Sequence, residues 1–229
     1  MVSSNILVIG GGSKIAKRFL TQLESDGCTV YKTFRHANQD AHTFSVDLSN
    51  KDSLRTFTKE VSGIAFDSVV FFSSTYTSDA VGLNELLDQY CKDFQCNALS
   101  LAYICKNIRL NPSSQVIAFG DSGISHPKRD FSSYSLSKLA LEDIIKILAV
   151  ELAPHTTVNA IRLGPTFSTN SSSTAYYDRY LVQKTIAEPI EGLIVLLNFM
   201  INNKQLNMTG SLIDYDGGAY LSRNTGQQA

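Results

Sequence analysis

Short apolar runs rich in β-branched and aromatic residues alternate along the chain with longer segments in which apolar residues recur at helical spacing. This alternation predicts an α/β fold, in which helices cover both faces of a parallel sheet. The pattern predicts seven strands, at residues 6–9, 29–34, 44–46, 68–72, 115–119, 158–163 and 211–215. It predicts helices at residues 15–24, 51–61, 83–108, 133–152 and 189–202, of which 83–108 is long enough to form two.

The length of 229 residues predicts a single domain, residues 1–229. One segment differs in composition, because residues 168–174 are all Ser, Thr or Asn and can bury little apolar surface. Aromatic and basic residues follow it, beginning at Tyr176. We therefore expect a flexible loop at about residues 166–188 that covers a substrate pocket, with Tyr176 contacting the substrate. The alternative is a surface loop without a functional role.

Charge and hydropathy exclude several classes of partner. Twenty Lys and Arg against 21 Asp and Glu give a net charge of -1, so no overall positive field attracts nucleic acid or anionic lipid. The longest apolar stretch, residues 190–201, is shorter than a membrane span, and the N-terminal residues do not form an export signal. We expect a cytoplasmic protein that binds neither nucleic acid nor membrane.

Cysteine and histidine spacing does not indicate a metal site. The four cysteines form no Cys-x-x-Cys pair, and the four histidines are scattered along the chain. We expect reduced thiols that pack as small apolar groups and no bound metal. His126 could line a substrate pocket, although an exposed loop position is the simpler interpretation.

A glycine-rich turn follows the first predicted strand and leads directly into a helix, in the order Gly10-Gly11-Gly12-Ser13-Lys14-Ile15. Glycine lets a diphosphate approach the backbone, and a helix N-terminus offers unpaired N–H groups with a partial positive charge. The turn therefore indicates an anion site. Taken alone the signal is weak, because many strand-to-helix turns use glycine for steric reasons.

The end of the second strand distinguishes between the two nicotinamide dinucleotides. An acidic residue there would bind the ribose hydroxyls of NAD, but the sequence ends in Phe34-Arg35-His36. Arg35 can pair bidentately with a 2′-phosphate, and Lys14 can add a second cation. This favours NADP(H) over NAD(H). The alternative is that both cations are solvated surface charges.

Tyr134 and Lys138 lie four residues apart in a predicted helix, so both side chains share one helix face. A free phenol is a poor proton donor or acceptor near neutrality, and a neighbouring ammonium lowers its pKa. The pair is therefore a candidate for acid–base catalysis. Taken alone, the same spacing also occurs by chance on solvated helix faces.

Several further features follow in a fixed order along nearly the whole chain. They are Gly10 in the turn, Asp47-Leu48 after the third strand, Asn97 in the long fourth helical segment, the Tyr134 and Lys138 pair, residues 151–154 and 158–161, Thr209-Gly210, and Asp216-Gly217-Gly218. With these features the chain resembles the short-chain dehydrogenase/reductase family, in its compact single-domain branch. The resemblance implies a Rossmann-like, doubly wound sheet and a homodimer or homotetramer.

The resemblance also implies site residues. The catalytic set would be Asn97, Ser122, Tyr134 and Lys138. The cofactor would contact Gly10, Gly12, Ser13, Lys14, Ile15, Arg35, Asp47, Leu48, Ser73, Tyr134, Lys138, Gly164 and Thr166. Two of these have simpler alternatives, because Asn97 could bond a neighbouring carbonyl within its helix and Asp47 could cap the helix that follows it.

The chain departs from the family pattern in the turn and at the catalytic serine. Lys14 and Ala16 stand where the family has its second and third glycines. In the family a serine holds the substrate oxygen about a dozen residues before the tyrosine, and here Asp121 and Ser122 compete for that position. We favour Ser122. If Asp121 faced the tyrosine instead, its carboxylate would oppose the effect of Lys138 and would have to be protonated, bind a cation or serve a different reaction.

The sequence thus predicts an NADP(H)-dependent oxidoreductase that interconverts a carbonyl and an alcohol by hydride transfer, with Tyr134 as general acid and base assisted by Lys138. Asp121 and Tyr176 are candidate substrate contacts. Two alternatives remain open at this point: a non-catalytic dinucleotide-binding sensor or partner-binding protein, and a sugar dehydratase or epimerase.

Overall fold

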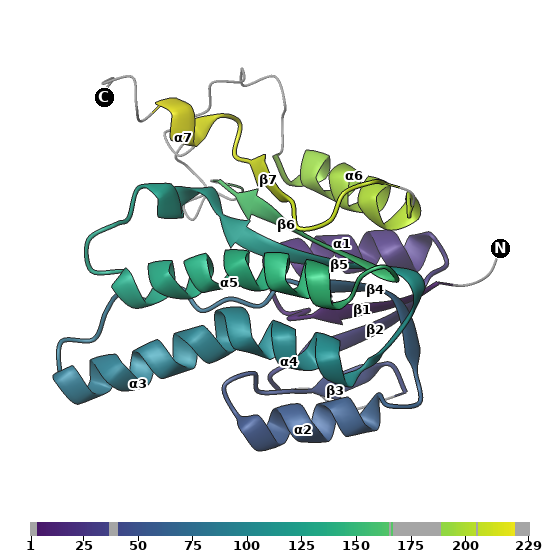
Figure 1. The fold of residues 1–229 in the computed structure, drawn as a ribbon, viewed down its shortest axis with the longest axis horizontal. Helices are drawn as coiled ribbons and strands as arrows, with labels where there is room; N and C mark the ends of the chain where they lie inside the picture. Colours follow the sequence, from purple (N-terminus) through teal and green to yellow (C-terminus); the bar gives the residue numbers. More distant parts are fainter. Residues whose placement is uncertain (1–3, 37–40, 165, 167–188, 205, 223–229) are drawn as a thin grey trace.

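A computed structural model describes residues 4–36, 41–164, 166, 189–204 and 206–222 (Figure 1). Seven strands form one parallel sheet in the order β3-β2-β1-β4-β5-β6-β7. The strands are β1 (Asn5–Ile9), β2 (Thr29–Phe34), β3 (Thr43–Ser45), β4 (Ala65–Phe71), β5 (Arg109–Asp121), β6 (Thr156–Leu163) and β7 (Leu212–Tyr215). The predicted Rossmann-like, doubly wound architecture is confirmed.

Helices cover the two faces of the sheet in two groups (Figure 1). One face carries α2 (Lys51–Glu60), α3 (Leu83–Phe94), α4 (Ser100–Asn107) and α5 (Ser132–Glu151), and the other carries α1 (Lys14–Ser25) and α6 (Pro189–Asn202). A short helix, α7 (Ala219–Ser222), and a 3-10 turn (Ser122–Ser125) were not predicted. Both lie at the carboxyl end of a strand.

Each face of the sheet buries its own apolar cluster, which explains why the strand sequences are apolar almost throughout. Leu7 of β1 and Val69 of β4 point into the cluster beneath α2 to α5, whereas Val8 and Val70 point into the cluster beneath α1 and α6. All four side chains are buried, as expected when a parallel sheet is covered on both sides. The sheet therefore forms a rigid support for groups placed at the strand ends.

The predicted helix at 83–108 is two α-helices joined without a break in direction by a π-helical turn, Gln95–Leu99. Such a turn inserts an extra residue into the helical ladder and is frequent at functional sites. Asn97 lies in the middle of the turn and is fully buried. The turn therefore fixes the direction of a polar side chain inside an otherwise apolar helix.

The order in which successive strands are added to the sheet reverses between β1 and β4. Strands β2 and β3 lie on one side of β1, while β5, β6 and β7 lie beyond β4. In open parallel sheets, ligands bind outside the carboxyl ends of the strands at this switch point. The glycine turn after β1, the segment after β4 and the start of α5 converge there (Figure 1).

The expected substrate loop at 166–188, including Tyr176, lies outside the described residues except for Thr166. Among the described residues, the helices are too short or too polar to cross a membrane.

Candidate active site

Two cavities adjoin each other at the carboxyl ends of the strands. The larger has a volume of about 600 Å³ and contains Tyr134 and Lys138, and the smaller has about 350 Å³ and contains Gly10 and Arg35. Both are lined by the same three residues, Ser13, Phe72 and Ser74. The two cavities therefore meet at these three residues.

The glycine turn after β1 is shaped for close approach to the backbone. Gly10 adopts φ +82°, and a Cβ atom there would lie 3.0 Å from the backbone nitrogen of Ser73. Its N–H donates to the hydroxyl of Thr33 on β2 at 3.1 Å. Ser13 caps α1 by accepting the N–H of Ala16 at 3.0 Å. The turn thus directs the N-terminus of α1 at the cavities, as an anion site requires.

Arg35 lies at the end of β2, is exposed and lines the smaller cavity. Asp47 lies near it: burial alone would raise the pKa of Asp47, but hydrogen bonds from Ser49 and the charges of Arg35 and Lys92 hold that pKa below its usual value. Ser49 donates both its N–H and its hydroxyl to Oδ1 of Asp47. The next helix is capped by Asn50, so the alternative role of Asp47 as its cap was wrong.

Helix α5 starts without a side-chain cap of its own, and a residue from another segment serves instead. Oδ2 of Asp79 accepts the N–H and the hydroxyl of Ser132 at 2.9 and 2.5 Å, and Oδ1 accepts the N–H of Ser133 at 3.1 Å. These donors are among the helix N–H groups that lack partners within the helix. Asp79 therefore fixes the first turn of α5, which carries Tyr134.

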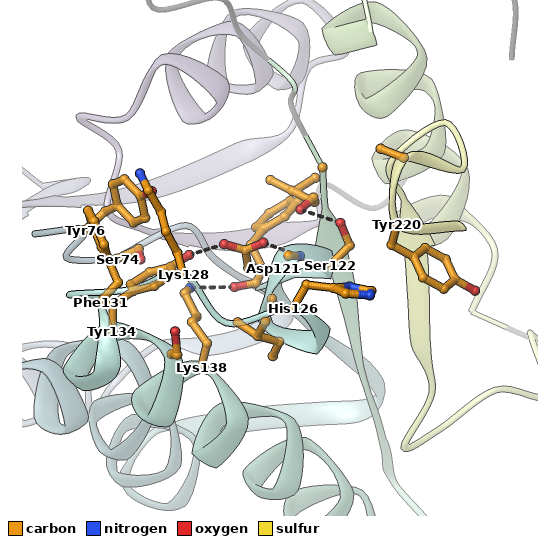
Figure 2. Close-up of a pocket in the computed structure, with 18 of the residues that line it drawn as sticks. Ser74, Tyr76, Asp121, Ser122, His126, Lys128, Phe131, Tyr134, Lys138 and Tyr220 are labelled. Atoms are coloured by element: carbon orange, nitrogen blue, oxygen red, sulfur yellow. Dashed lines mark hydrogen bonds between the residues drawn. The ribbon is translucent and has the colours of Figure 1, made fainter. Parts of the chain in front are cut away.

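Asp121, and not Ser122, faces Tyr134. The phenol of Tyr134 donates to Oδ2 of Asp121 at 2.6 Å, while the N–H of Gly123 donates to Oδ1 at 2.6 Å (Figure 2). Ser122 is buried and donates its hydroxyl to the carbonyl oxygen of Leu163 at 3.3 Å. The preference for Ser122 as the residue beside the tyrosine therefore differs from the geometry, because strand β5 ends with Asp121 pointing toward α5.

The environment of Tyr134 keeps its phenol protonated. Burial raises the pKa of Tyr134 far above its ordinary value, and the charge of Asp121 and the hydrogen bond to it act in the same direction. The side chain is 8% exposed. In this state Tyr134 is a proton donor and not a phenolate.

Lys138 lines the same cavity and makes its hydrogen bond with a backbone carbonyl. Its Nζ donates to the carbonyl oxygen of Phe119 at 2.8 Å and lies 6.0 Å from the centre of the Tyr134 ring. Burial lowers the pKa of Lys138 to about 8, although the Asp121 carboxylate acts in the opposite direction. Tyr134 and Lys138 lie on one face of α5 as expected, but the charged group in contact with the Tyr134 hydroxyl is the Asp121 carboxylate.

A buried polar network connects the π-helical turn to the start of α5. Oδ1 of Asn97 accepts the N–H of Thr75 at 2.7 Å, and its Nδ2 donates to the hydroxyl of Ser137 at 2.8 Å. Asp93, one turn earlier, accepts hydroxyl hydrogens from Thr75 at 2.5 Å and Ser133 at 2.7 Å. The side chain of Asn97 thus bonds to residues outside its helix, so its simpler interpretation as a bond to its own helix was wrong.

An aromatic wall beside Tyr134 was missed in the sequence. The ring of Tyr76 stacks on Phe131 at 4.9 Å and meets Tyr134 edge-on at 4.7 Å, and Nζ of Lys128 lies 4.5 Å from the Phe131 ring centre (Figure 2). Tyr76 is 57% exposed and lines the larger cavity. Its position in the segment that follows the end of β4 was the only signal in the sequence.

Some of the remaining predicted residues line one of the two cavities and others line neither. Gly12, Leu48 and Ser73 line the smaller cavity, while Ile15, Ser122 and Gly164 line the larger one. Lys14, Asp47, Asn97 and Thr166 are described but line neither cavity. His126, for which an exposed loop position was preferred, lines the larger cavity (Figure 2). Within the described residues no three His, Cys, Asp or Glu side chains form a metal-binding group.

Comparison with known proteins agrees with this fold. The family described as "Enoyl-(Acyl carrier protein) reductase" matches residues 16–219. The 3-oxoacyl-[acyl-carrier-protein] reductase FabG of Buchnera aphidicola subsp. Baizongia pistaciae is 25% identical over 96% of this chain and 89% of its own length. A short chain dehydrogenase family protein from Francisella tularensis subsp. tularensis has the same fold, with a TM-score of 0.80, 21% identity and coverage of 96% of this chain and 100% of that one.

The structure of BdcA in complex with NADPH also has this fold, with a TM-score of 0.76 and 18% identity over 93% of each chain. The glycine turn, the switch-point cavities and the Tyr134 and Lys138 pair therefore occur on a scaffold shared by relatives in sequence and in structure. The chain belongs to the short-chain dehydrogenase/reductase family of oxidoreductases.

Proposed function

We propose that the protein is an NADP(H)-dependent oxidoreductase that interconverts a carbonyl and an alcohol through Tyr134 and Lys138. The observation that carries this proposal is the pair of adjoining cavities, which share Ser13, Phe72 and Ser74. The smaller cavity contains the glycine turn and a cation, and the larger contains the proton donor. A dinucleotide that spans both would bring its nicotinamide end beside Tyr134.

The residues of the smaller cavity fit the adenosine half of such a cofactor. At Gly10 the missing side chain lets the backbone of Ser73 pack against the turn, and at Gly12 an added Cβ would meet only the Phe34 ring, at 3.9 Å. The open side of the turn at Gly12 and the N-terminus of α1 would receive the diphosphate. The end of β2 offers Arg35 and lacks an acidic residue that would prefer unphosphorylated ribose. The NADPH complex of BdcA, a protein of the same fold, supports the same cofactor.

The nicotinamide supplies or accepts the hydride, and the protein supplies position and proton chemistry. In the reductive direction Tyr134, kept protonated by burial and by Asp121, would donate a proton to the developing alkoxide. Lys138, whose ammonium is buried beneath the cavity, would hold the cofactor ribose and balance negative charge. Phe72 and Phe119, stacked at 4.6 Å, would exclude water from the reacting carbon.

Three residues, Asn97, Ser122 and Asp79, would act through other protein groups and not by contact with the substrate. Asn97 holds Thr75 and Ser137 on either side of the site, and Asp79 fixes the turn that carries Tyr134. The buried hydroxyl of Ser122 already bonds to the Leu163 carbonyl. We propose that these residues position the reacting groups.

Exposed apolar side chains support the proposal of a homodimer or homotetramer. Helix α3, the π-helical turn and α5 expose apolar residues, namely Leu87, Leu99, Leu136, Leu139, Ile147 and Val150. If these side chains form one patch, a second copy of the chain would cover it. Sedimentation would test this assembly.

Fluorescence titration with NADPH and NADH tests the proposed cofactor. The wild type should bind NADPH more tightly, and Arg35→Ala should remove most of that difference because the guanidinium pairs with the 2′-phosphate. Arg55→Ala, at an exposed position on α2, is the matched control. Equal affinities of the wild type for both cofactors would contradict the NADP(H) proposal.

A further inference from the structure

We infer that the larger cavity receives a cationic substrate and that the bond reduced there is a protonated carbon–nitrogen double bond. This inference rests on the proposed NADP(H)-dependent hydride transfer and replaces the carbonyl group of that proposal with a carbon–nitrogen double bond as the preferred hydride acceptor. It starts from the carboxylate of Asp121, which occupies the place beside Tyr134 where a carbonyl substrate would need a neutral or cationic hydrogen-bond donor.

Both oxygens of the Asp121 side chain accept hydrogen bonds. Oδ2 accepts the phenol hydrogen of Tyr134 and Oδ1 accepts the N–H of Gly123, so both oxygens act as acceptors. Asp121 is half-buried and lines the cavity, and it points toward Tyr134 (Figure 2). A negative charge therefore faces the space in which a substrate would react.

Among the residues that the structure describes, the two lysines that line this cavity make their printed contacts with groups other than Asp121. The Nζ atom of Lys138 is bonded to the Phe119 carbonyl, and that of Lys128 lies over the Phe131 ring. Burial also weakens the hold of Lys138 on its proton. A cation supplied by the substrate would complete the charge balance in the cavity.

The aromatic wall gives a second, independent reason to expect a cation. The rings of Tyr76, Phe131 and Tyr134 form a contiguous group beside Asp121 (Figure 2). Aromatic faces attract cations, and a flat cationic group can also stack on them. Because Tyr76 remains 57% exposed, part of its surface is available to a ligand.

The charge of Asp121 disfavours reduction of a ketone and favours reduction of a protonated carbon–nitrogen double bond. Reduction of a ketone develops negative charge on oxygen, which the adjacent carboxylate would repel, and it also requires a proton from Tyr134. A protonated C=N bond gains a hydride at carbon while its π electrons pass to nitrogen, so the substrate becomes a neutral amine as NADPH is oxidised to NADP⁺. This second step needs no proton from the protein, and Asp121 stabilises the cation that enters it.

The first test compares dihydroisoquinoline, a cyclic imine, with tetralone, a ketone of similar shape, by NADPH oxidation. The imine should have the higher kcat/KM by about tenfold or more, the effect expected of one hydrogen bond to a charged group. Asp121→Asn should reduce kcat/KM for the imine by a similar factor. Asp121→Ser, which restores a hydroxyl, should shift the preference toward tetralone. Equal or higher kcat/KM for tetralone in the wild type would overturn the inference.

The second test measures binding without turnover. Calorimetry with the NADP⁺-loaded protein would compare tetrahydroisoquinoline, a cationic amine, with isochroman, its neutral oxygen analogue. The amine should bind about tenfold more tightly or better, and Asp121→Asn should lose this advantage. Asp143→Asn, at an exposed site on the outside of α5, should keep it. Equal binding of the two probes by the wild type would refute the inference, whether or not either precursor turns over.

The outcomes separate this inference from the proposed function. A protein that binds NADPH and reduces tetralone but ignores the charge of its ligand would retain the proposed function and lose the inference. Failure to bind either nicotinamide cofactor would instead refute the proposed function. Circular dichroism of Asp121→Asn and Asp121→Ser distinguishes loss of charge from loss of folding.

Discussion

The phenol of Tyr134 donates its hydrogen to the carboxylate of Asp121 across 2.6 Å. Within the larger cavity, this hydrogen bond places a proton donor against a carboxylate. Burial raises the pKa of Tyr134 further and so favours the neutral phenol. The pair therefore sets both the direction in which a proton can move and the charge that a substrate meets.

Tyr134→Phe should abolish most of the turnover that depends on proton donation. Removing a positioned general acid costs about a hundredfold to ten-thousandfold in rate, while the NADPH affinity should remain nearly unchanged because the ring still fills the same space. Steady-state kinetics and cofactor titration measure the two quantities separately. Tyr103→Phe, on α4, is the control. A Tyr134→Phe variant that reduces a ketone at the wild-type rate would contradict the acid–base role.

Replacing Lys138 should change how stability depends on pH. Burial lowers the pKa of Lys138 from 10.5 in the unfolded chain to about 8 in the folded protein. Between these values the unfolded state binds more protons, so the wild type gains stability as pH rises, by about 1.4 kcal/mol per unit of pH from this group. Urea unfolding of the wild type and Lys138→Met from pH 7 to 10 should show that gain only in the wild type.

Lys146→Met, which removes an exposed lysine from the same helix, controls for the general effect of losing a positive charge. Parallel pH profiles for the wild type and Lys138→Met would show that the ammonium of Lys138 is not disfavoured by burial.

Asp79→Ala should destabilise the start of α5. Asp79 receives three hydrogen bonds from Ser132 and Ser133, and losing such a cap costs about 0.5 to 2 kcal/mol. Burial would raise the pKa of Asp79, but these bonds lower it below its usual value. The contribution is therefore present at neutral pH and lost as pH falls through that lowered pKa. Urea unfolding at neutral and acidic pH measures both effects.

The exposed Asp88→Ala on α3 is the matched control for Asp79→Ala. If both variants lost the same stability at every pH, the bonds from Asp79 to α5 would contribute nothing measurable.

Gly10→Ala should weaken both folding and cofactor binding. A Cβ atom at Gly10 would meet Ser73, and φ +82° itself costs a side-chain-bearing residue about 1 to 2 kcal/mol. Gly63→Ala is a suitable comparison, because a Cβ atom there would have nothing within 4 Å. Thermal unfolding and NADPH titration should show losses for Gly10→Ala alone. Wild-type behaviour of Gly10→Ala would mean that the turn can relax.

The sheet could be predicted from the sequence because its strands are buried on both faces and so consist of short apolar runs. Strand β5 is the exception: residues 115–119 were predicted, whereas the strand extends from Arg109 to Asp121. Its first residues, Arg109 and Leu110, pair with β4 at Ala65 and Phe66. This pairing depends on the neighbouring strand, and the local sequence, which is polar and contains Pro112, does not show it.

The site could be predicted only as far as local spacing determines it. Tyr134 and Lys138 share a helix face because they are four residues apart. Spacing could not choose between Asp121 and Ser122, since adjacent residues at the end of a strand point to opposite sides and an error of one position exchanges them. Asp79 and Tyr76 were missed because their contacts with α5 join segments that are more than fifty residues apart in the chain.

The π-helical turn lets α3 and α4 face different directions around their common axis. An α-helix turns by about 100° for each residue, so deleting a single residue from Gln95–Leu99 would straighten the ladder and rotate α3 by that angle relative to α4. Asp93 would then lose its hydrogen bonds with Thr75 and Ser133, although α4 could keep its apolar face on the sheet. The additional residue in the π-helical turn thus lets α4 pack against the sheet while α3 directs Asp93 toward the candidate active site.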